Sequence, residues 1–152
     1  MNRSQCKPSL SKLRILLIED EIILKKNIRL HLDKEGYETI AASTAKEARD
    51  ILEIRSVGII LLDIGLPDCN GLDLLEEIEE SMPKVPVIVM SAQDTLENKE
   101  RAKRLGASAF FKKPIILKHL KETIHAVHDM ALPEHEKTLK ASPLLGHMPQ
   151  QW

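Results

Sequence analysis

The feature that most constrains the fold is a repeated alternation of short apolar runs with longer amphipathic segments. The apolar runs lie at residues 13–18, 37–42, 57–62, 85–90 and 107–111. After each run, apolar residues recur at the three- and four-residue spacing that is typical of a helix. Continuous apolar strands that alternate with such helices predict a parallel sheet with helices on both faces. We therefore expect an α/β fold, a doubly wound (βα)5 sheet of five parallel strands.

Local signals mark where several of the helices begin and end. Thr44 and Glu47 have the spacing of a capping box, which predicts a helix start at Thr44. Asp94 with Glu97 three residues later predicts a further start. Gly106 then ends that helical pattern, since glycine is favoured just past a helix C-terminus. These signals agree with the expected order of strand and helix.

Length and composition bound the class of protein. A chain of 152 residues is expected to form one domain, here at 12–131, after a flexible N-terminal segment at 1–11 and before a polar tail or linker at 132–152. The net charge of -1 gives no electrostatic reason to expect nucleic acid as a partner. No apolar run approaches the roughly 20 residues of a membrane span, and the N-terminus lacks a secretion signal. Cys6 and Cys69 suggest no disulfide framework. We expect a cytoplasmic protein without a membrane partner.

Chemically active residues follow four of the five predicted strands. The first strand is followed by Glu19 and Asp20, the third by Asp63, the fourth by Ser91 and the fifth by Lys113. Because ligands bind outside the carboxyl ends of the strands in open α/β sheets, we expect these side chains to meet at one edge.

Three carboxylates at one edge favour a divalent cation. At about 4 Å and an effective dielectric constant of about 20, each pair of like charges costs roughly 4 kcal/mol. Oxygen ligands without clustered His or Cys indicate Mg²⁺ rather than zinc or copper. A carboxylate can accept a phosphoryl group, and a lysine and a metal ion can neutralise its oxygens during transfer. The pattern therefore predicts phosphoryl transfer to an aspartate.

The residues that carry this chemistry resemble those of a known family. The motifs are I-E-D-E at 18–21, L-L-D-I-G-L-P-D-C-N-G-L-D-L-L at 61–75, M-S-A at 90–92 and F-F-K-K-P at 110–114. Together and in this order they resemble the CheY-like receiver domain of two-component response regulators, over residues 13–131. The resemblance implies a flavodoxin-like sheet with the strand order 2-1-3-4-5.

The resemblance also implies a role for each site residue. Asp63 matches the phosphoacceptor, and Glu19 and Asp20 match the acidic pair that holds Mg²⁺ together with Asp63. The backbone carbonyl of Gly65, two residues after the acceptor, matches the usual backbone ligand of the metal.

Three further residues match the family's switch. Ser91 corresponds to the switch hydroxyl, Lys113 to the lysine that contacts the phosphoryl group, and Phe110 to the aromatic residue that swings inward. The implied function is to accept a phosphoryl group on Asp63 from a sensor histidine kinase or a His phosphotransfer protein. The implied output is altered binding of a downstream protein through the face of residues 94–105, 107–111 and the last helix. We expect a monomer or a weak dimer through that face, and no enzyme activity beyond self-phosphorylation and self-dephosphorylation.

Several other interpretations of the sequence compete with that of a phosphorylated receiver domain. Haloacid-dehalogenase-type phosphatases need a second Asp where this chain has Gly65, and nucleotide-binding folds need a phosphate loop where it has Glu19, Asp20 and Glu21. A pseudo-receiver, a binding module without phosphorylation, usually lacks a key residue, and none is missing here. The chain could also be a receiver fragment of a longer regulator, because residues 144–146 faintly resemble the entry to an ATPase domain. DNA binding by this chain alone is not expected.

Overall fold

A computed structural model describes residues 13–131. The predicted N-terminal segment at 1–11 and tail at 132–152, including residues 144–146, lie outside the described residues. The elements in chain order are β1 (Arg14–Ile18), α1 (Ile22–Lys34), β2 (Glu38–Ala42), α2 (Ala45–Ile54), β3 (Ile59–Asp63), α3 (Gly71–Ser81), β4 (Val87–Ser91), α4 (Leu96–Arg104), β5 (Ala109–Lys112) and α5 (Leu117–Ala131). Within residues 13–131, no helix combines the length and apolar character needed to cross a membrane.

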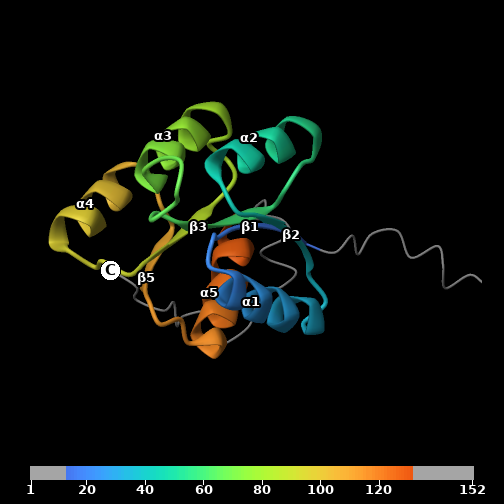
Figure 1. The fold of residues 1–152 in the computed structure, drawn as a ribbon. Coiled ribbons are helices and arrows are strands. Elements are labelled where there is room, and N and C mark those ends of the chain that lie inside the picture. Colours follow the sequence, from blue (N-terminus) through green and yellow to red (C-terminus); the bar gives the residue numbers. More distant parts are fainter. Residues whose placement is uncertain (1–12, 132–152) are drawn as a thin grey trace, which may run out of the picture.

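The five strands form one parallel sheet in the order β2-β1-β3-β4-β5, as predicted. Helices α1 and α5 cover one face, and α2, α3 and α4 cover the other (Figure 1). In the register of neighbouring strands, Asp63 lies opposite Met90, and Ser91 lies opposite Lys112. The carboxyl ends of β3, β4 and β5 therefore lie side by side, which confirms the fold class and brings residues of the predicted site to one edge of the sheet.

Side chains of each strand alternate between two core clusters, one on either face of the sheet. Leu62, Val89 and Phe110 belong to the cluster under α2, α3 and α4. Met90 and Phe111 belong to the cluster under α1 and α5. Successive strand residues point to opposite faces, so both faces of a central strand must be apolar. All five residues of β3 and of β4 are buried accordingly.

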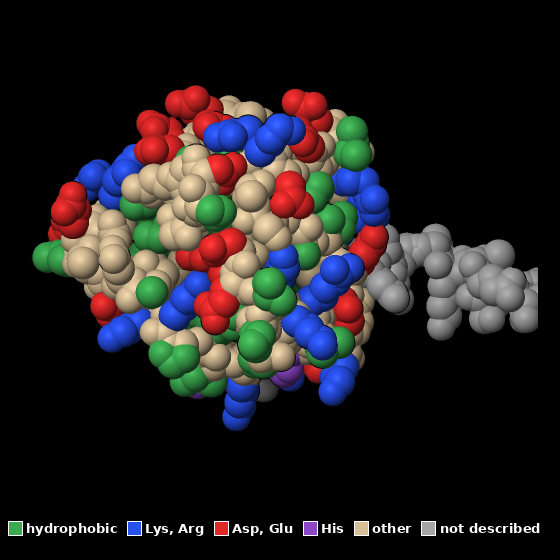
Figure 2. Space-filling view, viewed as in Figure 1, with side chains coloured by type: hydrophobic (Ala, Val, Ile, Leu, Met, Phe, Trp, Pro, Cys, Tyr) green, Lys and Arg blue, Asp and Glu red, His purple; other side chains and the backbone are tan. Residues whose placement is uncertain are grey.

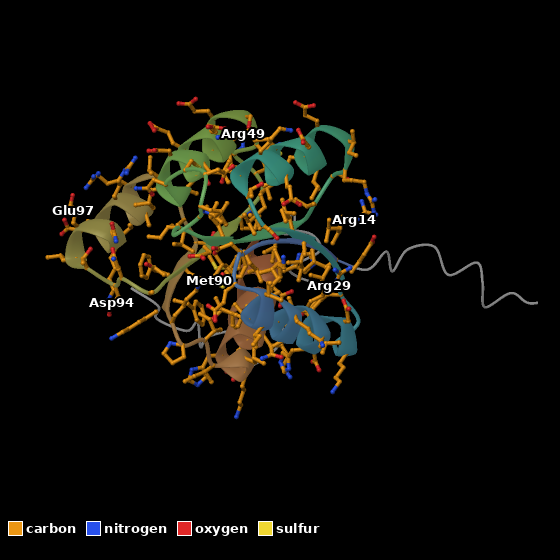
Figure 3. The ribbon with its side chains drawn as sticks, in the orientation of Figure 1. Arg14, Arg29, Arg49, Met90, Asp94 and Glu97 are labelled. Carbon is orange, nitrogen blue, oxygen red and sulfur yellow. The ribbon has the colours of Figure 1, made fainter. Side chains whose placement is uncertain are left out.

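The two predicted capping signals have different outcomes. The hydroxyl of Thr44 accepts a hydrogen bond of 3.0 Å from the amide of Glu47, so the start of α2 is confirmed. The predicted start of α4 at Asp94 is wrong, because the hydroxyl of Thr95 caps this helix. The carboxylate of Asp94 instead lies 3.7 Å from the ammonium of Lys112. Figure 3 shows Asp94 just before α4.

Gly71 begins α3 in close contact with the end of β3. A Cβ atom on Gly71 would lie 2.4 Å from Cα of Ile64 and 2.7 Å from the carbonyl oxygen of Asp63. The amide of Gly71 donates a hydrogen bond of 2.9 Å to the carbonyl of Ile64. The two atoms that a Cβ on Gly71 would meet belong to the backbone, which cannot move aside as easily as a flexible side chain. The missing side chain therefore allows α3 to start directly against the strand that carries Asp63.

Candidate functional site

The predicted residues converge at the carboxyl edge of the sheet. Asp63 and Ser91 are the last residues of β3 and β4. Glu19 follows β1, where its amide donates to the carbonyl of Ala42, and Lys113 follows β5, where its amide donates to the carbonyl of Ser91. Backbone hydrogen bonds that extend the sheet by one residue thus fix the positions of Glu19 and Lys113.

Lys113 lies between two buried carboxylates. Its ammonium donates hydrogen bonds of 3.1 Å to Oε2 of Glu19 and 3.1 Å to Oδ2 of Asp63. Its Nζ atom is also 2.9 Å from Oε1 of Glu19. The side chain of Lys113 is 15% exposed, whereas those of Glu19 and Asp63 are 0% and 5% exposed. The three groups therefore form a charged cluster that is largely shielded from solvent.

Burial dominates the electrostatics of this cluster. Burial raises the pKa of Glu19 to about 7, although the hydrogen bond from Lys113 acts to lower it. Burial also acts to lower the pKa of Lys113, but the contacts with Glu19 and Asp63 outweigh this effect and raise it. One ammonium thus faces two buried carboxyl groups, and Glu19 ionises only at a cost in desolvation.

The acidic residues fit a cation that prefers oxygen ligands. Carboxylate oxygens of Glu19, Asp20 and Asp63 all lie within 4.8 Å of one another. Oε1 of Glu19 is fully buried, and the ammonium of Lys113 lies 2.9 Å from it while also donating to Oε2 of Glu19 and Oδ2 of Asp63. One ammonium thus serves three oxygens of two buried carboxylates, and a further positive ion beside them would offset the remaining cost of burying two negative charges. The all-oxygen set suits Mg²⁺.

The site opens into a cavity of about 510 Å³. Asp20, Asp63, Gly65, Ser91 and Lys113 line the cavity, whereas Glu19 is not among its lining residues. Glu19 is thus buried outside the cavity wall, with its carboxylate against the ammonium of Lys113. The amide of Gly65 donates a hydrogen bond of 2.9 Å to Oδ1 of Asp63, which holds the loop after β3 against the carboxylate.

The amide side chains of Asn70, Gln93 and Asn98 also line this cavity, and none of them was among the predicted site residues. Asn70 caps α3, because its Oδ1 accepts a hydrogen bond of 2.8 Å from the amide of Leu72. Asn98 lies in the first turn of α4 and donates a hydrogen bond of 3.2 Å to the carbonyl of Gln93. An Asn just before a helix is a recognisable cap signal, but no local pattern places Asn98 at the site.

Ser91 is bonded to the loop that follows it. Its hydroxyl donates a hydrogen bond of 2.8 Å to the carbonyl of Gln93 and accepts one of 2.8 Å from the amide of Gln93. Asn98 donates to the same carbonyl. The Ser91 hydroxyl, which lines the cavity, and the Asn98 side chain, in the first turn of α4, thus donate to the same carbonyl oxygen.

Phe110 does not line the cavity. It is 3% exposed and packs in the core cluster that also holds Ala102 of α4. Phe110 lies opposite Val89 across β4 and β5. It is therefore buried between the sheet and α4. Its partner in the register of β4, Val89, lies two residues before Ser91.

Comparisons with known proteins agree with this geometry. The family model described as the response regulator receiver domain matches residues 15–125. The response regulator protein PilR of Pseudomonas aeruginosa is 31% identical over 140 residues, which cover 92% of this chain and 32% of PilR. The transcriptional regulatory protein BasR of Escherichia coli is 31% identical over 136 residues, which cover 90% of this chain and 60% of BasR. The chain therefore spans between about a third and three fifths of these relatives.

A solved structure supports the same assignment. The receiver domain protein (CheY-like) from Methanospirillum hungatei JF-1 is 32% identical, with a TM-score of 0.78, and the match covers 83% of this chain and 99% of that one. The chain belongs to the receiver domain family of response regulators. The general function of this family is signalling by phosphorylation, and its members generally depend on Mg²⁺. The matched family is a signalling family rather than an enzyme family.

Removing the ammonium of Lys113 from the charged cluster is expected to destabilise the fold. Without divalent ions at pH 8, Lys113→Met is expected to lower the free energy of unfolding by about 3 kcal/mol, because Glu19 and Asp63 lose their buried counter-charge. Burial already raises the folded-state pKa of Glu19 above its unfolded value, and loss of the hydrogen bond from Lys113, which acts to lower that pKa, raises it further, so the folded variant takes up more protons than the folded wild type. The loss should therefore shrink as the pH falls from 8 towards 5, as measured by urea unfolding.

The neighbouring lysine is a matched control. The side chain of Lys112 is 63% exposed and lies 3.7 Å from Asp94, so Lys112→Met should change stability by less than about 0.5 kcal/mol at either pH. Equal losses for the two variants, or a loss for Lys113→Met that does not depend on pH, would contradict the buried charge cluster.

Proposed function

We propose that Asp63 accepts the phosphoryl group in this receiver domain. The observation that carries the proposal is the Asp63 carboxylate itself, which ends β3, lines the cavity and lies 3.1 Å from the ammonium of Lys113. In the proposed reaction a carboxylate oxygen of Asp63 bonds to phosphorus. The bond from phosphorus to the donor's imidazole nitrogen breaks, and the imidazole regains a proton from solvent. The product is an acyl phosphate.

Glu19, Asp20 and Asp63 would hold Mg²⁺ together with the backbone carbonyl of Gly65. When bound, Mg²⁺ supplies positive charge that stabilises the oxygens of the phosphoryl group. Lys113 is the protein's own source of such charge, and its ammonium already contacts the acceptor carboxylate. Support for the ligand set comes from the converging carboxylates and from the single ammonium that faces two of them.

The switch would begin at Ser91. A phosphoryl group on Asp63 adds strong acceptor oxygens next to the Ser91 hydroxyl, which lines the same cavity. If the hydroxyl turns to donate to that group, the carbonyl of Gln93 loses one donor and keeps Asn98 of α4. The first turn of α4 and the buried Phe110 beneath it would then shift together. The surface of α4, β5 and α5 would change shape, as a bistable element biased by a local charge.

The proposed partners follow from this chemistry. The donor is a sensor histidine kinase or a His phosphotransfer protein, and the output is a downstream protein that binds the surface of α4, β5 and α5. The same surface would support a weak dimer of an otherwise monomeric domain, and Leu96 on α4 is 71% exposed there. The activity would be limited to self-phosphorylation and self-dephosphorylation, in the cytoplasm. Because the chain spans only part of its relatives, it also fits a receiver fragment of a longer regulator.

Phosphorylation by a small donor tests the proposal. Incubation with acetyl phosphate and Mg²⁺ should give a retarded band on a phosphate-affinity gel. The band should be absent with EDTA, since the carboxylates would lack their metal, and absent in Asp63→Asn. It should also disappear in alkali, because acyl phosphates hydrolyse there. A band that persists in Asp63→Asn would contradict the assignment, and the absence of a band in the wild-type chain would favour a pseudo-receiver.

Two adjacent phenylalanines test the switch. With Mg²⁺ and beryllium fluoride as the phosphoryl mimic, amide resonances of Leu96–Arg104 are expected to shift in the wild-type chain. Phe110→Leu should reduce these shifts but preserve those around Asp63, because Phe110 packs under α4. Phe111→Leu is the control, since Phe111 lies in the core cluster on the opposite face. Equal behaviour of the two variants would exclude a special role for Phe110.

A further inference from the structure

The N-terminus of α2 is capped from a distant part of the chain. The first amide groups of a helix have no partners within the helix. Here the hydroxyl of Thr44 accepts from the amide of Glu47. Asp68, from the loop after β3, accepts hydrogen bonds of 2.9 Å from the amide of Ala45 and 3.0 Å from the amide of Lys46, one with each carboxylate oxygen. One carboxylate thus serves two donors that are 22 and 23 residues away in sequence.

The carboxylate is suited to this task. The hydrogen bond from Ala45, with that from Lys46, lowers the pKa of Asp68, so the side chain is ionised near neutral pH. A negative charge at a helix N-terminus is also favoured by the helix dipole.

The loop that carries Asp68 is the one that carries Gly65. Its first half is anchored in the core, because Ile64 and Leu66 are each only 9% exposed. Its second half is more open, since Pro67, Asp68 and Asn70 are exposed. An isolated antiparallel bridge joins Gly65 to Asn70 in this second half. The two hydrogen bonds that Asp68 accepts from α2 therefore tie the part of the loop that pairs with Gly65 to another element of the fold.

Helix α2 is itself held in the fold by buried residues and by side-chain contacts with α3. Ala45 and Ala48 are fully buried against the sheet. Arg49 of α2 forms two hydrogen bonds with Glu77 of α3, at 2.8 and 2.9 Å. Figure 3 shows Arg49 between these two helices. A bidentate contact of this kind adds geometric specificity to the packing of the two helices.

We propose that Asp68 is a positioning residue that holds the loop after β3 against α2, and so keeps the backbone of Gly65 in place for Mg²⁺ at Asp63. The proposal rests on the proposed function of that site. Asp68 does not line the cavity, and its effect is exerted through the loop. Removing it leaves the amides of Ala45 and Lys46 to water and frees the open half of the loop.

The test compares Mg²⁺ binding by wild-type protein and three variants. Binding is monitored through the amide chemical shift of Gly65 in a Mg²⁺ titration. Asp68→Ala should weaken binding on the order of tenfold, as is common for groups that support metal ligands. Asp68→Asn should recover part of the affinity, because its one carbonyl oxygen can accept one of the two hydrogen bonds. Hydrogen exchange at Ala45 and Lys46 should accelerate in Asp68→Ala and be intermediate in Asp68→Asn.

Thr44→Ala is the matched control. It removes the other cap of α2 but leaves the loop untouched, and urea unfolding of each variant gives its effect on stability. Affinity for Mg²⁺ should stay near the wild-type value in Thr44→Ala. Equal weakening by Thr44→Ala and Asp68→Ala, or wild-type affinity in Asp68→Ala, would overturn this inference alone. A wild-type chain that binds no Mg²⁺ would overturn the proposed function together with it.

Discussion

The contact of Lys113 with two buried carboxylates sets the conditions for the rest of the site. Glu19 and Asp63 come from β1 and β3, and Lys113 comes from the end of β5. An ammonium 3.1 Å from an oxygen of each carboxylate stabilises an arrangement that burial would otherwise disfavour. The compensation is incomplete, because one ammonium faces two carboxylates and the pKa of Glu19 is raised to about 7. A site that is short of positive charge, with an open cavity beside it, is suited to bind a cation and then a phosphoryl group.

The fold provides this arrangement through simple geometric rules. Parallel strands end at one edge, so residues far apart in sequence meet there. The face of the domain shown in Figure 2 carries Lys and Arg side chains interspersed with Asp and Glu side chains. Such a surface gives no single-signed field, and specific recognition would depend on local contacts rather than on long-range attraction. The close start of α3 at Gly71 and the shared acceptor at Gln93 then connect the site to the helices that cover it.

Sequence patterns predicted the features that depend on local order and periodicity. The parallel sheet, the converging residues at the sheet edge and the cap at Thr44 belong to this group, because alternation and chain order predict them. The strand order was implied by the resemblance to receiver domains instead. The cap at Asp94 was wrong because Thr95, one residue later, offers an equally suitable acceptor. The bonds of Asp68 to α2 and of Asn98 to Gln93 could not be predicted, since they depend on how loops approach neighbouring helices. The full burial of Glu19 likewise depends on packing that no local pattern specifies.

The identity of the residue that carries the phosphoryl group is the central claim, and chemical trapping locates it most directly. After reaction with acetyl phosphate and Mg²⁺, borohydride reduces an acyl phosphate to an alcohol and so converts an aspartyl phosphate to homoserine. Peptide mass spectrometry should then find homoserine at position 63, and only in samples that contained Mg²⁺. Reduction at Glu19 or Asp20 instead, or reduction at position 63 without Mg²⁺, would contradict the assignment of Asp63 as the metal-dependent phosphoacceptor.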